Sequence, residues 1–100
     1  MLGIKVIIVR YISDEPQPGI VECQLEDAYG RRWSFVEKTA IVSAEDLDAR
    51  TPYPQPGMVD CEIVQRSRDA AGREVIRINT GIETTEGVTQ FDVLPESLVE

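Results

Sequence analysis

The chain has 100 residues, the size of one domain with a single hydrophobic core, so we expect one domain over residues 1–100. Its composition, 42% hydrophobic and 28% charged, argues against disorder along the whole chain. A net charge of −8 disfavours binding to nucleic acid and to anionic membranes. No segment approaches the roughly 20 apolar residues of a membrane span, and the apolar run at 6–9 is too short for a signal peptide. We therefore expect a cytoplasmic protein whose two cysteines are reduced thiols.

The first element is predicted to be a strand over residues 4–12. Apolar residues occupy both its odd and its even positions, so we expect it to be covered on both faces. An internal repeat follows. The ten residues from Pro16 reappear from Pro54 with six identities, and Asp-Ala-X-Gly-Arg occurs downstream of each, at 27–31 and 69–73. The second copy carries four extra residues, 65–68, between the two matches. We interpret 16–38 and 54–80 as pseudo-repeats of one strand–hairpin unit.

Each unit is predicted to form a turn, a strand, a hairpin and a returning strand. Pro-Gly favours a type II turn, and Asp-Ala-X-Gly-Arg suits a hairpin with glycine in the left-handed region. Period-two alternation then indicates half-buried strands. The residues expected to face inward are Val21, Cys23, Leu25, Trp33 and Phe35 in the first unit, and Val59, Cys61, Ile63, Ile76 and Ile78 in the second. Whether the two thiols lie near each other across a pseudo-two-fold axis is left open.

The remaining segments connect and close the two units. Residues 39–43 read as extended, and a capping-box pattern from Ser43 to Asp46 predicts one helical turn near 44–48. Prolines at 52, 54 and 56 favour an extended linker. A strand over 88–94 is expected to turn Phe91 and Val93 inward, with a single turn after it.

Six short strands separated by turn signals predict an all-β fold, a small barrel or sandwich that is SH3-like or OB-like by analogy. A closed barrel is preferred, because a lone sheet would leave hydrophobic edges open. The simplest arrangement relates the two hairpins by an approximate two-fold axis.

The residues that carry chemistry are few. With no histidine, the chain lacks the commonest general base and metal ligand. Two cysteines are too few for a structural zinc site, and their apolar strand face predicts slowly reacting core thiols. The acidic segments lack the spacing of a calcium loop, and no phosphate-binding glycine motif occurs. We predict no catalytic residue, no metal and no cofactor.

Arginines and one tyrosine are the candidate binding residues: Arg31, Arg32, Tyr53, Arg66, Arg68 and Arg73. The five arginines lie on the two predicted hairpins, where they either pair with neighbouring carboxylates or form a contact surface for an acidic partner or RNA. Tyr53, between two prolines, is the aromatic residue expected to be most exposed and either anchors a partner or covers the barrel mouth. Trp33 and Phe35 could stack on bases only if they faced outward.

The repeated Pro-Gly-X-Val-X-Cys, the Asp-Ala-X-Gly-Arg pair, residues 33–38 and 45–48, and Thr85-Glu86-Gly87 resemble a family of small, uncharacterised bacterial proteins. The resemblance spans nearly the whole chain. It implies a bacterial, cytoplasmic origin and brings no activity or site.

Three functions remain open. The first is a non-enzymatic protein-interaction domain that binds a protein partner, as an acidic inhibitor or immunity-type protein would, or that self-associates through strand edges. The second is a small barrel that binds RNA or single strands, with salt-sensitive affinity. The third is an enzyme that uses carboxylates in a cleft between the repeats.

Overall fold

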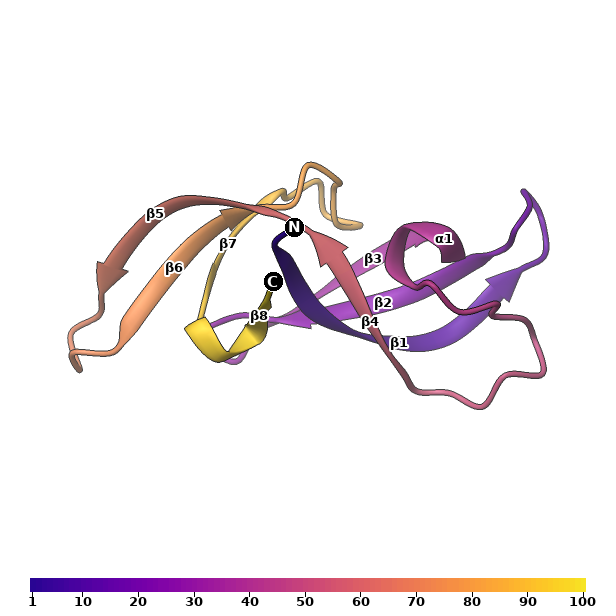
Figure 1. Cartoon of the computed structure of the whole chain (residues 1–100), viewed down its shortest axis with the longest axis horizontal. Helices are drawn as coiled ribbons and strands as arrows, with labels where there is room; N and C mark the ends of the chain where they lie inside the picture. The colour runs from indigo at the N-terminus through magenta and orange to yellow at the C-terminus, as the bar shows by residue number, and fades with distance from the viewer.

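The computed structural model describes all 100 residues and shows an elongated all-β molecule of 44 × 25 × 22 Å built from two antiparallel sheets (Figure 1). Its elements in chain order are β1 (Gly3–Ser13), β2 (Ile20–Glu26), β3 (Arg32–Lys38), α1 (Thr39–Val42), β4 (Gln55–Asp60), β5 (Glu62–Arg68), β6 (Glu74–Asn79), β7 (Gln90–Val93), the 3-10 turn η1 (Pro95–Ser97) and β8 (Leu98–Val99).

The two sheets share one continuous run of chain. The larger sheet has the order β3-β2-β1-β4, with β8 also paired to β1, and the smaller sheet has the order β5-β6-β7. β4 passes into β5 at Cys61, whose N–H donates to the Leu2 carbonyl at 3.0 Å. The all-β prediction is confirmed, and a sandwich describes the result. The preferred closed barrel is wrong, because β3 pairs only with β2 and β5 only with β6.

A single core fills the space between the inner faces of the sheets. Its largest fully buried side chain, Phe35, makes an edge-to-face contact with Phe91 at 6.0 Å between ring centroids, and Trp33 meets Phe91 at 5.4 Å. The core cluster contains Ile4, Val6, Ile8, Val21, Cys23, Leu25, Phe35, Val42, Leu47, Val59, Cys61, Ile76, Ile78, Phe91 and Val93. Nearly every residue expected to face inward is therefore buried or packed against this core, Trp33 being partly buried.

Ile63 is the exception, with 38% of its surface exposed. Its cross-strand neighbour Ile78 is buried, but β5 is exposed at all seven positions and a bulge interrupts its pairing between Ile63 and Gln65. The strand thus runs past the core (Figure 1), and the prediction of an inward Ile63 is wrong.

The two thiols are buried in the same core but not side by side. Cys23 pairs with Ile8, whereas Cys61 bonds to Leu2. Six residues of extended chain separate Ile8 from Leu2, about 20 Å at roughly 3.3 Å per residue. Matching repeat positions therefore do not bring the sulfurs together.

The short helix lies earlier than predicted. α1 occupies Thr39–Val42, where an extended stretch was expected, and residues 44–48 form no helix. The Ser43 hydroxyl does accept the Glu45 N–H at 3.0 Å, as in a cap, but Leu47 is drawn into the core and the chain turns away. α1 packs against Gly57 of β4, where an added Cβ would lie 2.9 Å from the Val42 carbonyl oxygen.

The two Asp-Ala-X-Gly-Arg hairpins have the same hydrogen bonds. In each, the aspartate carboxylate accepts two backbone N–H groups, and the aspartate N–H donates to the arginine carbonyl. Gly30 and Gly72 take φ of 81° and 83°, the left-handed values that the pattern predicted.

The two Pro-Gln-Pro-Gly segments differ from each other. The first is a turn, in which Gly19 has φ 125° and donates to the Pro16 carbonyl. The second lies within β4, where Gln55, Pro56 and Gly57 pair with Ile8, Ile7 and Val6 in turn. The predicted second Pro-Gly turn is therefore wrong, because pairing with β1 holds the segment extended.

Candidate functional site

Three of the candidate arginines hold the hairpins in place. Arg31 bonds to Glu86 at 2.9 Å and lies 3.8 Å above the Trp33 ring. Arg73 bonds to Asp69 at 2.7 Å and reaches across to the Ala28 carbonyl at 3.2 Å, which ties one hairpin to the other. Arg32 lies 3.5 Å from the Glu26 carboxylate.

The aromatic candidates have intramolecular partners as well. The Trp33 indole N–H donates to Asp27 at 3.0 Å, and the Arg31 guanidinium covers its ring. Phe35 is fully buried. Tyr53 is half-buried, packs against the core and donates its hydroxyl to the Asp48 carbonyl at 2.9 Å. The prediction that it would be the most exposed aromatic residue is wrong, because Tyr29 is 63% exposed. None of these three rings is an exposed stacking platform.

Arg66 and Arg68 are the two candidates that lie together on one open strand, β5. Arg66 contacts Glu74 at 3.4 Å, a long and exposed ion pair. Arg68 donates to the Gly72 carbonyl at 2.8 Å and has no carboxylate partner. Both guanidinium groups therefore remain available to a further acceptor.

The strand edges of the two sheets show why β5 stands apart. The β3 edge accepts the Thr85 N–H at Ser34, 2.8 Å, and the β7 edge accepts the Ala28 N–H at Asp92, also 2.8 Å. The outer edge of β4 carries Pro56, which has no N–H to offer. No loop donates to the outer edge of β5, and no proline blocks it.

The groups that face outward from β5 follow from its register. The Asp69 N–H donates to the Arg73 carbonyl at 3.0 Å, so the backbone of Asp69 faces β6. Backbone direction alternates along a strand, so Ser67 also faces β6 while Arg66 and Arg68 face away. The backbone N–H and C=O groups of Arg66 and Arg68 make no hydrogen bond within the chain. We call these groups, with the two arginine side chains, the β5 edge.

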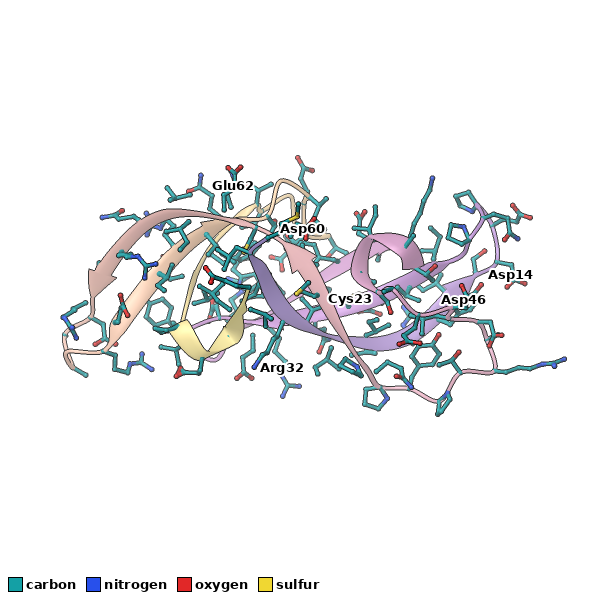
Figure 2. All side chains as sticks on the ribbon, in the orientation of Figure 1. Asp14, Cys23, Arg32, Asp46, Asp60 and Glu62 are labelled. Carbon is teal, nitrogen blue, oxygen red and sulfur yellow. The ribbon has the colours of Figure 1, made fainter.

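A shallow groove of about 440 Å³ on the outer face of the larger sheet is the other feature of note. Lys5, Ile7, Gln24 and Arg32 line it together with Leu94 beside η1, and Figure 2 shows Arg32 below β1 near that turn. Ile7 is 49% exposed here, so the prediction that the first strand is covered on both faces is wrong. Of its acidic groups, Glu26 faces Arg32, and Asp27 accepts loop N–H groups and the Trp33 indole. No pair of free carboxylates points into it.

The remaining reactive groups lie in the interior or in exposed ion pairs. Burial raises the pKa of the Cys23 thiol to about 12 and also raises that of Cys61, so neither is a thiolate at neutral pH. The hydrogen bond from Arg77 lowers the pKa of Asp92. No three His, Cys, Asp or Glu side chains lie close enough to hold a metal ion, and neither helix has the length and apolar character needed to cross a bilayer.

The sequence contains one feature that points to the β5 edge. The four residues that lengthen the second repeat, 65–68, include both arginines whose backbone groups point away from β6. Figure 2 shows Glu62, at the start of β5, pointing outward, while Cys23 lies in the interior.

Comparison with known proteins identifies no relative: no family model, no curated protein and no solved structure matches the chain. The resemblance to uncharacterised bacterial proteins therefore stays an expectation, and function must be argued from the surface alone.

Proposed function

We propose that this chain is a non-enzymatic protein-interaction domain of the cytoplasm, which binds a protein partner through the β5 edge. The observation that carries the proposal is a contrast among edge strands: β3 and β7 each accept a backbone N–H from a loop and β4 carries a proline, whereas β5 has neither a loop contact nor a proline. Open strand edges are sites of main-chain recognition between proteins.

Two further observations support a protein partner. The net charge of −8 offers nucleic acid little attraction, and the Trp33 ring, covered by Arg31, is not free to stack on a base. The two buried, protonated thiols also suit a reducing compartment.

The test compares the wild-type chain with the double variant Arg66→Glu/Arg68→Glu as bait in lysate of the source organism. We expect one stoichiometric protein to be retained by the wild type at physiological salt and lost with the double variant. Arg50→Glu is the control, because Arg50 is exposed, forms no ion pair and belongs to the segment between α1 and β4, which Figure 1 shows away from β5.

Circular dichroism and thermal unfolding should show that all three proteins are folded. Retention of the same partner by the double variant would refute the assignment of the β5 edge. Sedimentation that shows only a homodimer of the wild-type chain, with no second protein, would refute a separate partner.

A further inference from the structure

We infer that the partner supplies an extended segment that pairs antiparallel with β5 and carries acidic side chains at two alternate positions, opposite Arg66 and Arg68. This inference rests on the proposed function and names the chemistry that the β5 edge recognises.

The backbone of the edge supplies the first half of the argument. Arg66 and Arg68 each present an unpaired N–H and C=O on the same side of β5. Two residues of extended chain span about 6.7 Å, the repeat at which an added strand presents its own donors and acceptors. A partner strand can therefore form two hydrogen-bonded residue pairs here without any change in the sheet.

The side chains supply the second half. In the register with β6, Arg66 lies across from Ile76 and Arg68 across from Glu74, so both arginines are on one face of the sheet. Residues directly opposite in an added strand would have Cβ atoms about 5 Å from those of the arginines. Carboxylates at positions j and j+2 of that strand would reach both guanidinium groups. Arg68, which has only a carbonyl partner, gains a charge-assisted hydrogen bond.

In two registers, self-pairing of β5 between two copies of this chain brings like charges together. Two-fold antiparallel pairing of β5 with itself, centred on Arg66 or Ser67, would place arginine opposite arginine. Like charges directly across two strands are destabilising. In these two registers the arginines repel each other, whereas an acidic strand pairs with both of them.

The experiment uses two synthetic peptides of identical composition and charge, each acetylated and amidated. The probe is Thr-Val-Thr-Glu-Val-Glu-Val-Thr, with both glutamates on one face of a strand. The control is Thr-Val-Thr-Glu-Glu-Val-Val-Thr, with the glutamates on opposite faces. Binding to the full chain is measured by NMR titration, and amide hydrogen exchange locates the site.

We expect the probe to bind at least about tenfold more tightly than the control, because only the probe pairs both arginines on one face. Exchange at the Arg66 and Arg68 amides should slow in the complex. The double variant Arg66→Glu/Arg68→Glu should lose the probe, and Arg50→Glu should bind it as the wild type does.

Equal affinities for the two peptides, protection elsewhere than on β5, or no binding at millimolar peptide would each overturn strand addition. The proposed function fails separately, if the lysate partner is retained by the double variant. If the double variant loses the lysate partner but the Arg66 and Arg68 amides are not protected in the complex, the proposed function as an interaction domain is supported and strand addition is refuted.

Discussion

Replacing Gly57 with alanine tests how tightly α1 is packed against the larger sheet. The backbone angle of Gly57 lies outside the left-handed region, so alanine brings no conformational strain. Its Cβ, however, would lie 2.9 Å from the Ile8 side chain and 2.9 Å from the Val42 carbonyl oxygen. Ile8 is fully buried and the carbonyl is backbone, so α1 must shift to admit the methyl group.

The magnitude follows from two opposing effects. Overpacking a tight core site costs about 1–3 kcal/mol. Removing the freedom of glycine in the unfolded chain stabilises by about 0.4–1 kcal/mol. We expect Gly57→Ala to lower the free energy of unfolding by about 1–2 kcal/mol, a Tm decrease of about 5–15 °C for a domain of this size.

Gly3→Ala is the matched control. Its Cβ would also meet atoms closer than 3 Å, but these belong to the flexible Met58 side chain, which is 40% exposed and can move. Urea unfolding followed by Trp33 fluorescence measures both variants. The packing argument would be refuted if Gly57→Ala were as stable as the wild type, or if Gly3→Ala lost more unfolding free energy than Gly57→Ala.

Three further changes test other parts of the structure. Neither Cys23 nor Cys61 should react with a thiol reagent at pH 8 until denaturant is added, because burial raises both thiol pKa values; stoichiometric labelling of the native protein within minutes would contradict this. Asp92→Asn should destabilise the protein at neutral pH. Because the folded-state pKa of Asp92 is lowered, its contribution is present above about pH 4 and fades as the pH falls through that lowered pKa; urea titrations that show the same difference at pH 6 and pH 2 would refute it. Asp27→Ala removes the hydrogen bond of the Trp33 indole N–H and should therefore shift the emission of this single tryptophan, whereas Asp69→Ala in the other hairpin should leave the spectrum unchanged; identical spectra for Asp27→Ala and the wild type would contradict this.

Alternation of apolar and polar residues predicted which side chains enter the core, because burial of one strand face is imposed locally at every second residue. Val21, Cys23, Leu25, Phe91 and Val93 all follow it. The hairpins were predictable for a similar reason, since the aspartate and glycine of each turn satisfy its backbone directly.

The misplaced elements depend on partners distant in the sequence. Pro-Gln-Pro-Gly is a turn at 16–19 but is extended at 54–57, because the second copy pairs with β1. The helical turn lies at 39–42 and not at 44–48, where Leu47 is instead buried in the core, a tertiary contact that the capping pattern at Ser43 does not encode. Local patterns do not specify which strand becomes an edge, so they could not predict that Arg66 and Arg68 would lie on an open one.

The pairing of β1 has a consequence for how the chain folds. Ile4 lies opposite both Val59 and Leu98, so the first strand is completed only by segments from the middle and the far end of the sequence (Figure 1). Contacts of such wide sequence separation slow the search for the native state. During synthesis β1 can pair with β2 early, but its other neighbours arrive late, and the N-terminal part of that strand stays unprotected until β8 has left the ribosome.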